Sequence, residues 1–201
     1  TANLHARCAD RILLVVGRFE ARSFEELFEG VRALPWENFI GEHTRFPVNG
    51  KCARSQLMSV RDCQAITKKA IVERLRSRYH TDWFVEDGET ASIDVALHGD
   101  VAQLTLDASG TALNRRGYRT WNGEAPLRET LAAALVTLSP WRPGMPLHDP
   151  MCGTGTLMIE AAMRMAHRAP GLARSFAIES WRDMPTDAFE RIREQAKADF
   201  D

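Results

Sequence analysis

The stretch that decides the fold of the second half of this chain is Asp149-Pro150-Met151-Cys152-Gly153-Thr154-Gly155-Thr156. Residues 146–150 are a short strand candidate, and residues 157–168 have the pattern of a helix. Two glycines two positions apart let the backbone turn sharply and approach a ligand with no Cβ in the way. A further helix is expected over residues 127–138. The order helix, strand, glycine turn, helix predicts the start of an α/β Rossmann-like domain.

The residues that known motifs require reduce the number of ligands that could bind at this turn. A phosphate-binding P-loop needs a lysine after the second glycine, and a dinucleotide fingerprint needs a third glycine where Met158 stands. A cofactor with an amino-acid end and no phosphate fits better, because Asp149 can face an ammonium group while the glycine backbone lies against a nucleoside. S-adenosylmethionine (SAM) is such a cofactor. The alternative is that Gly153 and Gly155 form only a strand-to-helix turn.

The helix over residues 127–138 should have Pro126 in its first turn and one apolar stripe toward the core. The stripe consists of Leu127, Leu131, Ala134, Leu135 and Leu138. Thr186 is placed to cap a last helix over residues 187–198.

The first half of the chain alternates between strand and helix patterns. Residues 12–16 have the composition of a buried strand, and Ser23 can cap an amphipathic helix that ends at Arg32. The pair Asn49-Gly50 is favoured in tight turns. Ser59 and Asp62 resemble a capping box for a long helix over residues 60–79. Residues 92–97 and 101–107 alternate around residues 98–100, which predicts a β-hairpin.

Charge is distributed unevenly along the chain. Residues 43–80 carry nine Lys and Arg side chains against two acidic ones, a net charge of +7 in a chain whose total is −1. Clustered cations favour contacts with phosphate groups, so this segment is a candidate surface for a polyanion. The solvated face of an amphipathic helix would produce the same run of charge.

The composition excludes several classes of protein. Hydrophobic residues make up 44% and charged residues 26% of the 201 residues, a balance typical of folded globular proteins. No run approaches the roughly 18 apolar residues of a membrane helix, so we expect no membrane partner. The four cysteines are widely spaced, and the six histidines lack the H-x-x-x-H spacing. We therefore expect a cytoplasmic protein with reduced thiols and no metal.

Four sequence blocks occur in the order in which one known family has them. They are Leu113-Asn-Arg-Arg-Gly-Tyr-Arg119, Ala125-Pro-Leu-Arg-Glu-Thr-Leu-Ala-Ala-Ala134, the glycine turn with Ile159-Glu-Ala-Ala162, and Ala169-Pro-Gly171 with Trp181. The chain thereby resembles the THUMP-domain RNA methyltransferases. It is most similar to the bacterial ribosomal RNA guanine-N2 methyltransferases, once named N6-adenine-specific DNA methylases. The resemblance implies SAM as the cofactor, with residues 149–156 as its binding segment.

The resemblance also implies the organisation of the chain. An α+β THUMP and ferredoxin-like region would be followed by the start of an α/β Rossmann-like methyltransferase domain. Residues 1–40 would be a partial ferredoxin-like unit, residues 41–110 the THUMP RNA-binding domain, and residues 111–201 the N-terminal part of the methyltransferase domain. The basic excess of residues 43–80 falls in the THUMP part, which supports RNA binding there independently.

Basic side chains of the THUMP part and of the connector after it are the candidate RNA ligands. They are Lys51, Arg54, Arg61, Lys68, Lys69, Arg115, Arg116 and Arg119. Arginine suits phosphate recognition because its guanidinium is a planar fork of donors. Trp121, close to the connector arginines, could stack on a base.

Two features of the family do not occur in these 201 residues. One is the catalytic motif, an Asn or Asp followed by two prolines and an aromatic residue. The other is the acidic residue after the second strand, which would hold the cofactor ribose. We therefore expect a fragment of a longer protein that transfers no methyl group by itself.

The leading hypothesis is a SAM-dependent RNA methyltransferase that acts on the N2 amine of a guanine in large-subunit ribosomal RNA. An enzyme of this kind must take its target base out of the stack. The alternative among enzymes is an N6-adenine-specific DNA methyltransferase. The alternative outside enzymes is a non-catalytic RNA-binding module. The sequence leaves the oligomeric state open.

Overall fold

The computed structural model describes residues 1–120, 125–181 and 184–200. The chain divides into two compact units. The first, named the sheet unit, comprises residues 13–110 and 180–184. The second, named the turn unit, comprises residues 1–12, 111–179 and 185–201. Trp121 lies outside the described residues.

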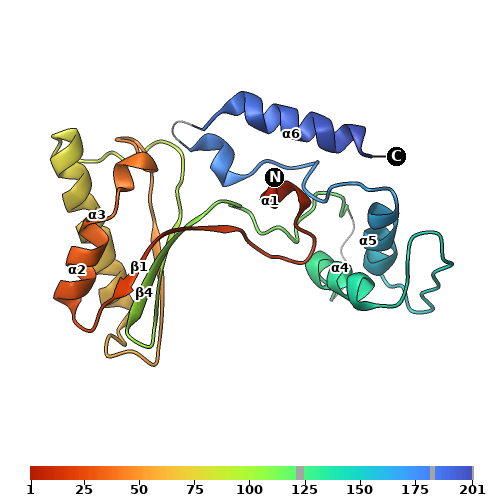
Figure 1. The fold of residues 1–201 in the computed structure, drawn as a ribbon, viewed down its shortest axis with the longest axis horizontal. Helices are drawn as coiled ribbons and strands as arrows, with labels where there is room; N and C mark the ends of the chain where they lie inside the picture. The colour runs from red at the N-terminus through yellow and green to blue at the C-terminus, as the bar shows by residue number, and fades with distance from the viewer. Residues whose placement is uncertain (121–124, 182–183, 201) are drawn as a thin grey trace. The chain divides into compact units, whose positions relative to one another are not determined.

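The described part of the sheet unit is built on four strands in the order β1-β4-β3-β2. They are β1 (Leu13–Glu20), β2 (Val48–Ala53), β3 (Ile93–His98) and β4 (Val101–Asp107). β1, β4 and β3 are antiparallel neighbours, whereas β2 runs parallel to β3. The helices α2 (Phe24–Arg32) and α3 (Val60–Tyr79) pack against each other on one side of this sheet (Figure 1). A short 3-10 helix, η1 (Trp36–Asn38), lies between α2 and β2.

Serine caps start both helices, as the sequence predicts. The Ser23 Oγ accepts a hydrogen bond from the Glu26 N–H at 3.1 Å, and the Ser59 Oγ accepts one from the Asp62 N–H at 3.4 Å. These bonds satisfy N–H groups that have no partner inside the helix. The helix over residues 60–79 and the hairpin of β3 and β4 are confirmed.

Asn49 and Gly50 lie inside β2, so the expected tight turn is wrong. They pair with Asp94 and Val95 of β3. A Cβ at Gly50 would lie 2.9 Å from the Gln64 Cγ. The glycine therefore lets α3 approach the strand closely, and its role is in packing.

β1 is an edge strand, which corrects the expectation that residues 12–16 are buried. Leu13, Leu14 and Val15 are 41%, 39% and 54% exposed, because only β4 lies beside this strand. The pairing of β1 with β4 also places residues 13–20 in the same sheet as β2 to β4. Residue 40 is therefore no boundary between compact units, and residues 1–12 belong to the turn unit.

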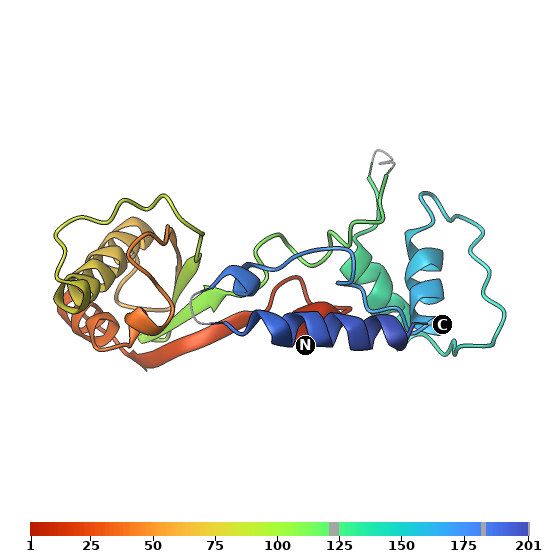
Figure 2. The same cartoon turned by 90° about the horizontal axis from the view of Figure 1, so that it is seen from above.

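The described helices of the turn unit are α1 (Ala2–His5), α4 (Glu129–Leu138), α5 (Thr156–Met165) and α6 (Thr186–Ala198). Another 3-10 helix, η2 (Ala177–Ser180), precedes α6. Leu4 of α1 and Ala196 of α6 belong to one buried cluster with Phe176, and the two helices lie side by side in both views (Figures 1 and 2). The Asp10 carbonyl accepts a hydrogen bond from the Leu113 N–H at 2.8 Å.

α4 buries a different face from the one expected. Leu131, Leu135 and Leu138 are 50%, 45% and 84% exposed. The buried apolar positions are Ala132, Ala133 and Val136, and Val136 packs with Trp141 and Ala161. The helix starts at Glu129, so Pro126 precedes its N-cap position, Arg128.

Residues 146–150 form no strand, and none is assigned elsewhere in the described part of the turn unit. A parallel strand is held by hydrogen bonds to neighbouring strands, and the described residues of the turn unit supply none. Pro185 occupies the N-cap position of α6, so Thr186 is its first residue.

Candidate functional site

The glycine turn leads directly into α5. Gly153 and Gly155 have φ angles of +53° and +73°, in the left-handed region that side chains other than hydrogen disfavour. The Gly155 N–H donates to the Cys152 carbonyl at 2.8 Å, which closes the turn. Gly155 is the N-cap of α5, and no side chain caps this helix. The turn therefore presents uncapped helix N–H groups, which suit a polar or anionic ligand group.

The eight predicted cofactor residues form one continuous segment with graded exposure. Met151 is 89% exposed, whereas Thr156 is 3% exposed. One oxygen of the half-buried Asp149, Oδ1, accepts from the Met151 N–H at 3.1 Å. The other, Oδ2, has no partner among the described residues. A Cβ at Gly153 would meet no atom within 4 Å, so the outer side of the turn is open.

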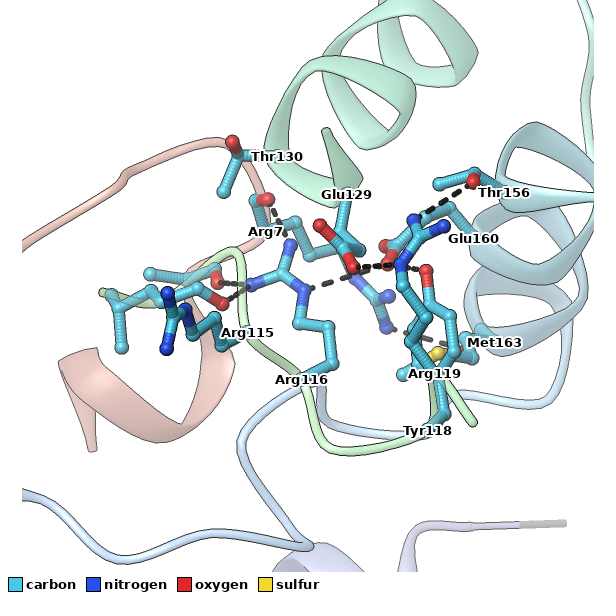
Figure 3. A network of polar contacts seen from close by, with 12 residues as sticks. Arg7, Arg115, Arg116, Tyr118, Arg119, Glu129, Thr130, Thr156, Glu160 and Met163 are labelled. Carbon is cyan, nitrogen blue, oxygen red and sulfur yellow. Dashed lines mark hydrogen bonds and ion pairs between the residues drawn. The ribbon is translucent and has the colours of Figure 1, made fainter. Parts of the chain in front are cut away.

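Arg116, one of the predicted RNA ligands, is buried inside the turn unit. It is 3% exposed, and its Nε lies 3.4 Å from the Glu160 Oε1. The carbonyls of Ala6, Arg7 and Leu113 also accept hydrogen bonds from its guanidinium. Figure 3 shows this guanidinium among its partners. Arg116 therefore holds together three segments of the turn unit.

Arg119 also points inward rather than to solvent. Its Nε donates to the Glu129 Oε1 at 2.9 Å, and its two terminal nitrogens donate to the hydroxyls of Thr154 and Thr156 at 3.1 and 3.0 Å. Its side chain is 15% exposed. Of the three connector arginines expected to bind RNA, only Arg115 is exposed.

The sequence did not predict the buried pairing of Glu160, although this residue lies in one of the four family blocks. Burial raises the pKa of this carboxyl, while Arg116 and Tyr118 act in the opposite direction. The Tyr118 hydroxyl donates to the Glu160 Oε1 at 3.1 Å. Burial, and then the neighbouring Glu160 charge, raises the pKa of Tyr118. A glutamate at position 5 of an apolar helix such as α5 is the signal that could have indicated this buried pair.

Lys68 is engaged inside the sheet unit. Its Nζ lies 2.5 Å from the Glu86 Oε1, donates to the Phe46 carbonyl at 3.0 Å and lies 3.6 Å from the centre of the Phe46 ring. It therefore ties α3 to the loop before β2. The other predicted RNA ligands of this unit are exposed: Lys51, Arg54, Arg61 and Lys69.

A groove of about 500 Å³ adjoins the connector of the turn unit. Arg115 and Arg128 are exposed members of its lining, and Arg119 and Glu129 are less exposed ones. The Arg128 side chain is 71% exposed, and its Nη1 lies 3.7 Å from the Asp10 Oδ2. The groove is therefore lined by accessible cations and also by Arg119, whose guanidinium contacts the glycine turn.

No group of three or more His, Cys, Asp or Glu in residues 1–120, 125–181 and 184–200 is arranged to hold a metal ion. Within the same ranges, no helix has both the length and the apolarity needed to cross a membrane.

Comparison with known families identifies both parts of the chain. The THUMP domain family matches residues 21–107, and the RMKL-like methyltransferase domain matches residues 116–201. A match to the THUMP domain is thus followed along the chain by a match to the RMKL-like methyltransferase domain. This confirms the resemblance and the fold class inferred from the sequence.

Individual relatives agree with this assignment. The chain is 48% identical to the Bacillus subtilis protein named "Putative RNA methyltransferase YpsC", over 100% of this chain and 53% of the relative. A Listeria monocytogenes structure titled "predicted N6-adenine-specific DNA methylase" is 46% identical, with a TM-score of 0.95 over 99% of this chain and 53% of its own. A methyltransferase structure titled as complexed with SAH is 44% identical, with a TM-score of 0.93 over 100% of this chain and 53% of its own. The chain thus spans about half the length of these relatives.

Proposed function

We propose that this chain is part of a SAM-dependent RNA methyltransferase whose target is the N2 amine of a guanine in large-subunit ribosomal RNA. The observation that carries the proposal is the glycine turn at the start of α5. It combines two left-handed glycines with a helix N-terminus that no side chain caps.

The residues of the turn fit SAM. The open side of Gly153 leaves room for a nucleoside, and the Asp149 Oδ2 is free to accept from an ammonium group. Residues 149–156 would hold the cofactor, which supplies a methyl group activated by its sulfonium. The SAH in one related structure supports this choice, because SAH is SAM without that methyl group.

The exposed cations support RNA as the substrate. The sheet unit has four accessible cations among the predicted ligands: Lys51, Arg54, Arg61 and Lys69. In the turn unit, Arg115 is accessible. Phosphate contacts of this kind fix the register of an RNA and carry little base information. The choice of guanine and of ribosomal RNA therefore rests on the family resemblance. A cytoplasmic location goes with this substrate as part of the proposal.

One observation favours a second candidate function. The name of the Listeria monocytogenes relative specifies the N6 amine of adenine in DNA. Both reactions methylate an exocyclic amine, so a SAM site alone does not separate them. The THUMP domain and the name of the Bacillus subtilis relative favour RNA.

The test uses the gene-encoded full-length protein with methyl-labelled SAM. Large-subunit RNA, small-subunit RNA and duplex DNA are offered separately, and the products are digested to nucleosides. We expect label in N2-methylguanosine from large-subunit RNA alone. Label in N6-methyladenine from DNA would establish the second function instead, and label in no substrate would overturn both.

A further inference from the structure

Arg119 connects the glycine turn to the start of α4. Its terminal nitrogens donate to the hydroxyls of Thr154 and Thr156, the residues on either side of Gly155. The two hydroxyls also lie 3.0 Å apart and share a hydrogen bond. The guanidinium is therefore hydrogen-bonded to the residues before and after Gly155, the left-handed N-cap of α5.

The guanidinium is itself fixed from the other side. Glu129 accepts from its Nε at 2.9 Å, and the Leu127 carbonyl accepts from a terminal nitrogen at 3.2 Å. The side chains of Arg119 and Glu129 are only 15% and 8% exposed. Figure 3 shows Arg119 between Glu129 and Thr156. A planar fork held by a carboxylate and a carbonyl presents its remaining donors in one fixed direction.

We infer that Arg119 is a positioning residue for the cofactor and does not contact RNA. By holding Thr154 and Thr156, it fixes the turn in the conformation that the cofactor requires. Four of the five guanidinium N–H groups already donate to described residues of the turn unit, so a phosphate that accepts two hydrogen bonds from this fork would have to displace at least one of them. The inference rests on the proposed function in one respect, namely that residues 149–156 bind SAM.

The test compares Arg119→Met and Arg119→Lys with wild type in the gene-encoded full-length protein. Arg164→Met is the matched control, since Arg164 on α5 donates to the Thr137 Oγ1 on α4 at 3.1 Å, away from the turn. Calorimetry measures the Kd for SAH, and thermal unfolding checks that each variant is folded. A charge-assisted fork is worth enough that Arg119→Met should weaken SAH binding about 10- to 100-fold. Arg119→Lys should recover only part of this loss, and Arg164→Met should bind SAH as wild type does.

Two further measurements separate positioning from a general loss of structure. A third variant, Arg119→Ala, leaves space for a free guanidinium ion. Guanidinium added to the solution should restore the SAH affinity of Arg119→Ala and leave the SAH affinity of Arg164→Met unchanged. If Arg119→Met does not fold, Thr154→Val removes one accepting hydroxyl and should itself weaken SAH binding. RNA affinity without cofactor should be the same in Arg119→Met and wild type.

The outcomes distinguish this inference from the proposed function. Wild type that fails to bind SAH overturns the proposed function and the inference with it. Wild type that binds SAH while folded Arg119→Met binds it equally well overturns the inference alone. A loss of RNA affinity with unchanged SAH affinity would return Arg119 to the RNA ligands and overturn the inference.

Discussion

Arg116 and Glu160 form an ion pair inside the turn unit, with side chains 2% and 0% exposed. The pair links the connector after β4 to α5. The second carboxylate oxygen of Glu160 has no hydrogen-bond partner among the described residues. The charge of Glu160 is therefore stabilised by Arg116, Tyr118 and the nearby Arg7. Breaking a buried pair by removing one partner costs about 3–5 kcal/mol, because the remaining charge is left buried.

Replacing Arg116 by methionine should therefore lower the free energy of unfolding by about 3 kcal/mol. Arg115→Met is the control, because its side chain is exposed and such changes stay within about 0.5 kcal/mol. Urea unfolding of both variants measures the difference. Equal stabilities of the two would show that the Arg116 pair contributes nothing.

The ion pair between Glu37 and Arg74 in the sheet unit should make stability depend on pH. Two hydrogen bonds from Arg74, at 3.0 and 2.6 Å, hold the pKa of Glu37 below its ordinary value of 4.5. The folded state thus binds this proton less readily, so its contribution is complete above pH 4.5 and is lost as pH falls through the folded pKa. Glu37→Gln should cost about 1 kcal/mol at pH 7, because solvent partly screens the pair. Unfolding curves from pH 7 to pH 3 should show the difference from wild type shrinking with acid; a constant difference would refute the assignment.

Gly155→Ala should weaken the binding of SAH. Its φ of +73° costs a residue with a Cβ about 1–2 kcal/mol, which the turn can relieve by changing shape. Gly144→Ala is matched, because Gly144 has a φ of +91° and open space around it in the turn unit. Both variants should lose similar stability, whereas only Gly155→Ala should bind SAH more weakly by calorimetry. Equal SAH affinities would remove the turn from the cofactor site.

The basic residues of the sheet unit should divide into two groups in RNA binding. Lys51→Ala and Arg61→Ala each remove an exposed cation. Because log K falls as log salt rises, each variant should make this slope less steep by roughly one unit. Lys68→Met should leave the slope unchanged and lower stability instead, because Lys68 is bound to Glu86 and Phe46. Filter binding at several salt concentrations tests this division. A smaller slope for Lys68→Met would show that Lys68 leaves its partners to meet RNA.

Local signals in the sequence predicted the elements of the sheet unit well. Ser23 and Ser59 cap the helices as expected, since a cap depends on residues within one turn. The Asn49-Gly50 pair misled because the parallel pairing of β2 with β3 overrides a local turn preference. Pairing across more than 40 residues leaves no mark in a short window of sequence.

In the turn unit, the sequence predicted the glycine turn well and the packing of the helices less well. The left-handed Gly153 and Gly155 follow from the sequence, because few other residues tolerate that backbone. The buried face of α4 did not follow, since leucine and alanine positions both give a helical stripe and the neighbouring α5 selects the alanine side. An arginine in a polar connector also looks the same in sequence whether it binds phosphate or, as Arg116 does, a buried glutamate.

The hydrogen bond between Asp10 and Leu113 closes a loop that contains nearly all of the sheet unit. The chain leaves the turn unit and returns to it at the same point, so the sheet unit is an insertion within another unit. Residues 1–12 are synthesised before the sheet unit, yet Leu4 meets its buried partners Phe176 and Ala196 only after Ala196 has emerged from the ribosome. β1 to β4 can pair before that moment. The order of synthesis therefore lets the inserted unit form first, whereas residues 1–12 complete their packing only after α6 has been made.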